Sequence, residues 1–158
     1  MPCVSYQRPD LSREGPTIAV IVRPSSAFLS AQKEQGSDAE VPSVRSLMLV
    51  DTGASGSAVD HEVIERLGLQ PTGALSIATP SHDHHDVLTY DIDLIIEDNR
   101  VHIADVPVFA IGLKKQGIPG LIGRDVLKHM LLVSNGYSSH FTLAVSSPGD
   151  TSTPCSPR

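Results

Sequence analysis

One aspartate in this chain is followed by a run of small residues. Residues 51–55 read D-T-G-A-S and come directly after the apolar pair Leu49 and Val50. A carboxylate at the end of a buried strand can act as a general base on water, and small neighbours leave room for a substrate to approach. The same residues also fit an ordinary turn capped by an aspartate side chain. The motif alone therefore does not decide between catalysis and a structural turn.

A second motif, in the last third of the chain, changes that balance. The apolar pair Leu121 and Ile122 is followed by Gly123, Arg124 and Asp125, within the run G-L-I-G-R-D-V-L. Together the two motifs resemble the aspartic proteases, and this run is similar to the corresponding segment of the retroviral-type members, the retropepsins. The resemblance covers roughly residues 17–145. It implies an all-β, retropepsin-like acid protease fold, a closed β-barrel with one or two short helices.

The number of catalytic motifs then sets the expected assembly. An aspartic protease uses two carboxylates that share one proton around a single water, but this chain contains one D-T-G. Asp150 and Thr151 are followed by Ser152 and do not repeat it. We therefore expect a two-fold symmetric homodimer in which Asp51 faces its symmetry mate. A pepsin-like arrangement with both halves in one chain is excluded.

The resemblance also implies a role for each residue of the two motifs. Asp51 would be catalytic, and Thr52 would hydrogen-bond across the dimer axis. Gly53 would offer its backbone to an extended peptide or protein substrate, and Ala54 would line the pocket beside the scissile bond. Leu121, Ile122 and Gly123 would pack behind the Asp51 loop, and Arg124 and Asp125 would brace the loop or the dimer.

This sequence departs from the viral pattern beside that brace. In viral relatives the arginine pairs with an acidic residue just after D-T-G-A, and here that position is Ser55. We expect Asp125 or Asp60 to take the place of the missing acid.

The expected flap is also unlike its viral counterparts. Residues 79–86, which begin Thr79, Pro80, Ser81 and His82, are polar, lack glycine and hold three of the seven histidines. The simplest interpretation is a solvated turn between two strands. A histidine-driven pH response of the flap and metal binding by H-D-H-H-D are alternatives, although this spacing rarely gives good coordination geometry. The sequence predicts no metal site and no cofactor.

Composition narrows the class of protein further. The formal net charge is −6 and aromatic residues make up 4% of the chain, with no tryptophan. A nucleic-acid interface is therefore not expected. Apolar runs are far too short for a membrane span. We expect a soluble protein of the cytoplasm.

The remaining segments must position these motifs. We expect a flexible lead at 1–15, one domain over 16–145 and a disordered tail at 146–158. An exposed loop is expected at 30–45. The strand at 46–50 is apolar throughout and should be buried on both faces, whereas 87–96 alternates, with Asp93 on its polar side. Helices are expected at 60–68, with Asp60 as N-cap and Gly68 as stop, and at 123–132. Other strands are expected at 17–22, 75–79, 101–111, 121–122 and 141–145.

The sequence thus predicts an aspartic-type endopeptidase that hydrolyses peptide bonds with water activated by an Asp51 dyad. The alternative is a peptide-binding or dimerisation module on the same fold that performs no catalysis.

Overall fold

The structure is a computed structural model that describes residues 3–36, 40–79, 82–96 and 101–145, with the backbone alone for residues 3, 77–79 and 82–85. Its strands are β1 Cys3–Gln7, β2 Thr17–Pro24, β3 Val44–Val50, β4 Ala58–Val59, β5 Gly73–Thr79, β6 His82–Ile96, β7 Val101–Ala110, β8 Gly120–Ile122, β9 Met130–Asn135 and β10 His140–Val145. Its helices are α1 Leu11–Glu14, α2 Ser26–Glu34, α3 His61–Leu67, the 3-10 helix η1 Lys114–Gln116 and α4 Arg124–Leu127.

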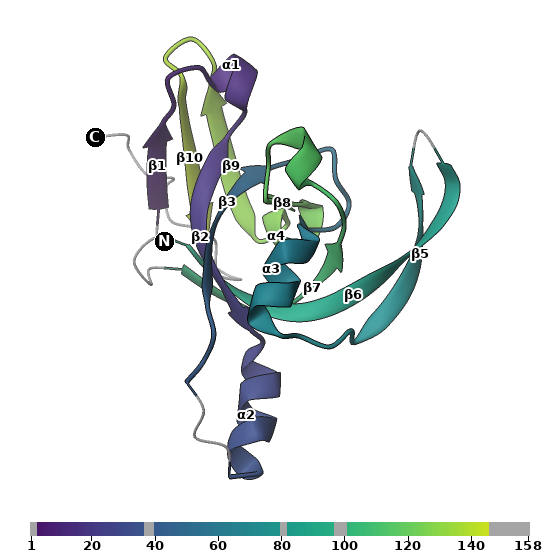
Figure 1. The fold of residues 1–158 in the computed structure, drawn as a ribbon. Coiled ribbons are helices and arrows are strands. Elements are labelled where there is room, and N and C mark those ends of the chain that lie inside the picture. Colours follow the sequence, from purple (N-terminus) through teal and green to yellow (C-terminus); the bar gives the residue numbers. More distant parts are fainter. Residues whose placement is uncertain (1–2, 37–39, 80–81, 97–100, 146–158) are drawn as a thin grey trace.

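Six strands close into a barrel. Their order is β2-β3-β8-β4-β7-β6, and β2 also pairs with β6 to complete the ring, while β5 pairs only with the far end of β6. The interior holds the buried aliphatic side chains, among them Ile18, Met48, Ile92 and Ile122. The β5–β6 hairpin projects from the barrel as an arm (Figure 1). The all-β barrel with few short helices confirms the fold expected from the sequence.

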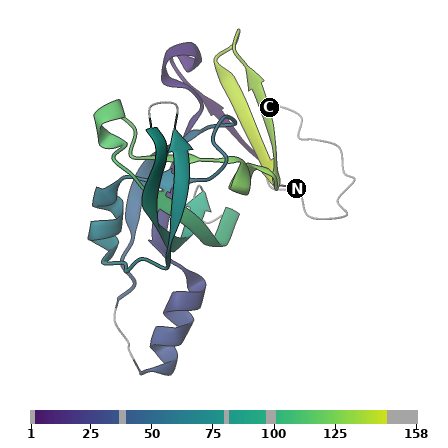
Figure 2. The same cartoon turned by 90° about the vertical axis from the view of Figure 1, so that its right-hand side faces the viewer.

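A second, three-stranded sheet stands beside the barrel in the order β1-β10-β9. In both views it projects to the same side of the barrel as the β5–β6 hairpin, and α2 projects to the opposite side (Figures 1 and 2). Val4, Tyr6 and Leu11 contribute to the core, and Tyr6 stacks on Phe141 with ring centroids 5.0 Å apart. The flexible lead expected at 1–15 is therefore wrong over residues 3–15, because β1 pairs with β10 across its whole length. The tail expected at 146–158 lies outside the described residues.

The helix expected after the first motif is confirmed. Asp60 caps α3 by accepting a hydrogen bond from the Glu62 N–H at 3.1 Å, and Gly68 ends the helix in the left-handed conformation. Val63, Ile64 and Leu67 form its buried face. Asp60 also accepts from the Lys114 N–H at 2.7 Å. Burial acts to raise the pKa of this carboxyl, but the backbone N–H donors outweigh it and lower the pKa overall.

Two other expectations for the first half are wrong. β3 is not buried on both faces: its exposure alternates and Leu47 is 47% exposed, because the strand forms a single-layered barrel wall. The loop expected from residue 30 is helical up to Glu34, since α2 begins at the Ser25 N-cap and contains good helix formers. No residue of α2 is buried, so the apolar stripe that would have revealed the helix is missing.

The second half differs from expectation in one long segment. The helix expected over 123–132 is limited to α4, and the residues from Met130 onward form β9, which pairs with β10. The apolar residues of 130–133 fit both a helix face and a strand, and the partner strand decides between them. β7 continues through Pro107, which pairs with Asp91 of β6.

Asp93 is the largest departure from the sequence pattern. It was expected on the polar side of its strand, but it is completely buried in β6. Its carboxylate accepts hydrogen bonds from the Ser26 N–H at 3.0 Å, the Asp105 N–H at 3.0 Å and the Ser26 hydroxyl at 2.5 Å. Arg23 lies 3.2 Å away and His102 2.7 Å away. Burial acts to raise the pKa of Asp93, but these donors outweigh it and lower the pKa to about 2.

None of the helices within the described ranges combines the length and the apolar character needed to cross a bilayer.

Candidate active site

Asp51 lies where β3 leaves the barrel wall. β3 pairs in parallel with β8, with Val50 level with Ile122, and the Asp51 N–H continues this ladder by donating to the Ile122 carbonyl at 2.9 Å. Both apolar pairs of the sequence motifs are therefore adjacent strands. The loop that follows β3 lies at the end of the barrel between the β5–β6 hairpin and the three-stranded sheet (Figure 1).

The Asp51 carboxylate is half-buried and weakly engaged. Its Oδ1 accepts one hydrogen bond, from the Gly53 N–H of its own loop, at 2.8 Å. Within the described residues its Oδ2 has no hydrogen bond or ion pair. A carboxylate with open lone pairs can accept a proton from a water or share one with a second carboxyl group.

Arg124 holds the loop through its backbone. Its Nη1 donates to the carbonyl oxygens of Thr52 and Gly53, each at 2.9 Å. The expectation that Asp125 or Asp60 would pair with Arg124 is therefore wrong. Asp60 is occupied at the start of α3, and Asp125 bonds to another part of the loop. Backbone carbonyl oxygens thus accept the hydrogen bonds of Arg124, in place of an acidic side chain at position 55.

Asp125 braces the far side of the same loop. It accepts from the N–H of Ser57 at 3.0 Å through Oδ2 and from the Ser57 hydroxyl at 2.8 Å through Oδ1. The Ser57 oxygen in turn accepts from the Gly123 N–H at 3.0 Å. Ser57 is fully buried, so this chain of bonds fixes the segment between Asp51 and α3 onto the start of α4.

Glycine is required where the two motifs touch. A Cβ on Gly123 would lie 2.5 Å from the backbone carbon and oxygen of Gly56. Such a contact is sterically forbidden, so only glycine permits this approach. Gly123 thus packs β8 and α4 directly against the Asp51 loop.

The other predicted residues surround Asp51 in different ways. Thr52 and Gly53 are exposed and Ala54 is half-buried, so all three are accessible from outside the barrel. Leu121 is half-buried, whereas Ile122 is 1% exposed and belongs to the core. Ile122 therefore supports the loop from beneath and does not face solvent beside it.

The predicted flap corresponds to the β5–β6 hairpin. Thr79 pairs with His82 at its end, so β6 begins within the segment that was expected to be a turn. Pro80 and Ser81 lie outside the described residues, as do the side chains of Thr79 and His82. Among the side chains that the structure does describe, no group of three or more His, Cys, Asp or Glu could hold a metal. The histidines of the flap lie outside that set, so the alternatives of metal binding and pH response stay predictions.

Sequence reasoning missed Gly56 and Ser57. The signal was present, since D-T-G-A-S continues as G-S and such a run of small residues allows close backbone packing. Asp93 was missed for another reason: an acidic residue amid Ile92, Leu94 and Ile95 was assigned to the solvent face, although a charge within an apolar run can be buried when several donors surround it.

Comparisons with known proteins agree with this geometry. The family model described as gag-polyprotein putative aspartyl protease matches residues 37–129, more than half of the chain. The crystal structure of a retropepsin-like aspartic protease from Rickettsia conorii is similar, with a TM-score of 0.53 and 15% identity, over 90% of this chain and 89% of that one. At that identity the likeness shows the fold alone. A comparison with curated proteins finds no match.

Proposed function

The chain belongs to the gag-polyprotein aspartyl protease family, and from that premise we propose that it is an aspartic endopeptidase completed by homodimerisation. Asp51 is the residue we propose as catalytic. The observation that carries the proposal is its open carboxylate, held in a loop that Arg124, Ser57 and Asp125 fix in place.

The chemistry requires a second carboxyl group, and the chain supplies one D-T-G. Two neighbouring carboxylates cannot easily both ionise, so the pair holds one proton. The ionised Asp51 takes a proton from water while the oxygen of that water attacks the scissile carbonyl carbon. The protonated Asp51 of the other copy donates a hydrogen bond to the carbonyl oxygen. Transfer of a proton to the amide nitrogen then breaks the C–N bond.

The surface around the loop supports a second copy of the chain. The exposed Thr52 hydroxyl has no hydrogen bond within the described residues, so it is available to a partner loop. β9 is an edge strand of its sheet, and Leu131 and Val133 on it are 39% and 51% exposed. Unpaired edges with apolar side chains favour strand pairing with another chain. Because β9 follows α4 directly, pairing there would act close to the loop that Arg124 braces.

A peptide substrate would lie between the loop and the β5–β6 hairpin. Both flank the same end of the barrel (Figure 2). An extended peptide can hydrogen-bond to exposed backbone such as Gly53, and the half-buried Ala54 would face the residue beside the scissile bond.

Asp51→Asn tests the proposal. The substitution keeps the shape of the side chain and the acceptor for the Gly53 N–H, so fold and dimer should persist while cleavage of unfolded casein disappears. Circular dichroism, sedimentation velocity and a cleavage assay measure the three properties. Cleavage that persists in rigorously purified Asp51→Asn protein would reject the mechanism. A wild-type dimer that never cleaves would favour the peptide-binding module instead.

The pH dependence gives a second test. The dyad works with one shared proton, so cleavage should be fastest at mildly acidic pH and fall as that proton is lost. A rate that rises steadily into the alkaline range would contradict a shared-proton mechanism.

A further inference from the structure

β3 has an unpaired stretch of backbone beside a cavity. β8 begins at Gly120, level with Met48, so it pairs only with the last three residues of β3. Residues 44–47 continue beyond it with β2 on one side. A cavity of about 260 Å³ lies on the other side, between this part of β3, helix α3 and the segment that precedes β8.

The hydrogen-bond pattern shows which backbone groups face the cavity. The Val50 N–H donates to Pro16 on the β2 side, whereas the Asp51 N–H donates to Ile122 on the β8 side. Backbone direction alternates along a strand, so Arg45 and Leu47 face away from β2. Within the described residues, the N–H and C=O of Arg45 and the N–H of Leu47 have no partner strand.

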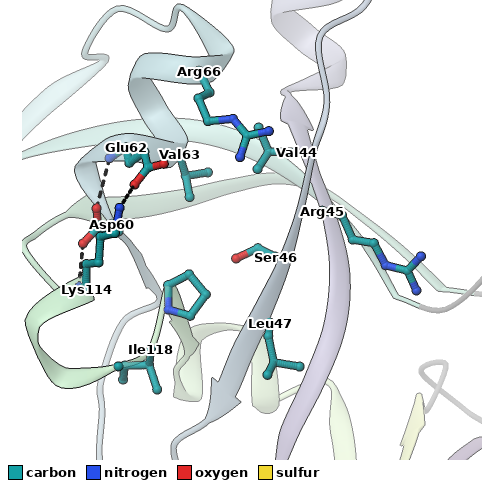
Figure 3. Close-up of a pocket in the computed structure, with 12 residues that line it drawn as sticks. Val44, Arg45, Ser46, Leu47, Asp60, Glu62, Val63, Arg66, Lys114 and Ile118 are labelled. Carbon is teal, nitrogen blue, oxygen red and sulfur yellow. Dashed lines mark hydrogen bonds and ion pairs between the residues drawn. The ribbon is translucent and has the colours of Figure 1, made fainter.

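In the part of the chain that the structure describes, the acidic side chains around the cavity have partners, whereas two arginines beside it do not. Glu62 is paired with Lys114, and Asp60 accepts two backbone N–H groups. Arg66 lies above Val44 at one end of the cavity, and Arg45 extends on the other side of β3 (Figure 3). Neither arginine has an acidic partner among the described side chains. This local positive charge stands out in a chain whose net charge is −6.

We propose that this part of β3 is a docking site for an extended acidic peptide segment, separate from the Asp51 site. The segment adds as a strand to the free edge at Arg45 and Leu47. Side chains of an added strand alternate between faces, so one carboxylate meets Arg45 outside the barrel and another meets Arg66 beside α3. Its apolar residues contact Val44 and the exposed Leu47. Binding needs no cleavage and does not depend on the function proposed for Asp51.

The experiment measures binding in the Asp51→Asn protein, so that the probe is not cut. The probe is a fluorescein-labelled peptide that repeats Val-Glu-Glu-Val, which places glutamate and valine on both faces of an extended strand, and its counterpart with lysine in place of glutamate is the comparison. Fluorescence anisotropy should show saturable binding of the glutamate probe and at least about tenfold weaker binding of the lysine probe. Equal binding of both probes, or no saturable binding of the glutamate probe, would overturn the proposal.

Variants on this background locate the site. Leu47→Pro removes the N–H that faces the cavity, which edge positions tolerate, together with the exposed leucine side chain, and should weaken binding about tenfold. Arg66→Glu should weaken it similarly. Arg13→Glu is the matched control, because Arg13 also lies exposed in the last turn of a short helix, and binding should be unchanged.

Folding of each variant is checked by circular dichroism. If Leu47→Pro does not fold, Leu47→Glu replaces it, since this exposed position accepts a charge that repels the probe. If the affinity for the glutamate probe is unchanged by the Leu47 and Arg66 substitutions, the peptide binds elsewhere and the docking site is refuted.

Discussion

Asp51 and Asp93 are both aspartates of the barrel wall, but they differ in burial and in the number of hydrogen bonds that they accept. Asp93 is fully buried and surrounded by donors from β2, α2 and β7. Asp51 is half-buried and accepts one hydrogen bond from its own loop. A carboxylate that holds elements together is saturated with donors, whereas one that remains open can bind a proton, a water or a substrate. The contrast is the physical reason to assign structure to one and chemistry to the other.

The two sites also differ in where their order comes from. At Asp93 the side chain itself is the centre of the network, so its removal leaves Arg23 and two backbone N–H groups without their acceptor. At Asp51 the order lies in the loop, which Arg124 and Asp125 hold through groups other than the carboxylate. Substitutions at the two aspartates should therefore separate stability from activity.

The largest effect on stability is expected for Asp93→Ala. Removing one partner from a buried ionic network leaves the others unpaired, which costs about 3–5 kcal/mol of the free energy of unfolding. Urea unfolding measures it, with Asp91→Ala on the same strand as the control because Asp91 is only half-buried. If Asp93→Ala loses no more free energy of unfolding than Asp91→Ala, the structural role assigned to Asp93 is contradicted.

Acid should weaken the wild-type protein through the same residue. The pKa of Asp93 is lowered from 3.8 to about 2, so the unfolded chain binds more protons in that interval and stability falls as pH decreases from 3.8 towards 2. The loss should be roughly 2 kcal/mol. Urea titrations across this range should show it in the wild type and show a flatter dependence in Asp93→Asn. Parallel curves would contradict the assignment.

Arg124→Ala should have the smallest effect on stability and a clear effect on activity. The guanidinium is exposed, so unfolding free energy should change by no more than about 1 kcal/mol. The Asp51 loop loses two hydrogen bonds to its carbonyls, and the resulting misplacement should lower kcat about tenfold. Arg13→Ala is the control, and unchanged kinetics in Arg124→Ala would show that the loop does not need this brace.

Much of the fold could be predicted because local signals agreed with the tertiary structure. Asp60 and Gly68 marked both ends of α3, and the two apolar pairs before Asp51 and Gly123 became adjacent strands. The signals for α3 lie within one element, whereas the close packing of Gly123 was implied by the resemblance to the retropepsins, and the structure places that glycine against Gly56.

The rest depended on partners distant in sequence. β1 forms because β10 offers a complementary edge, and the short alternation of Val4 and Tyr6 with Ser5 and Gln7 is a weak signal without that partner. The burial of Asp93 requires Ser26 of α2 to converge with His102 and the backbone of Asp105, both on β7. The hydrogen bonds from Arg124 to the carbonyls of Thr52 and Gly53 could not be predicted either. Every residue has a backbone carbonyl, so residue types do not show which of them accepts a bond.

The central claim is that each chain carries half of an active site. Cleavage measured over a range of protein concentrations, with the dimer fraction determined by analytical ultracentrifugation, tests it most directly. Specific activity should follow the dimer fraction and vanish on dilution to monomer. Specific activity that stays constant in fully monomeric protein would contradict the account.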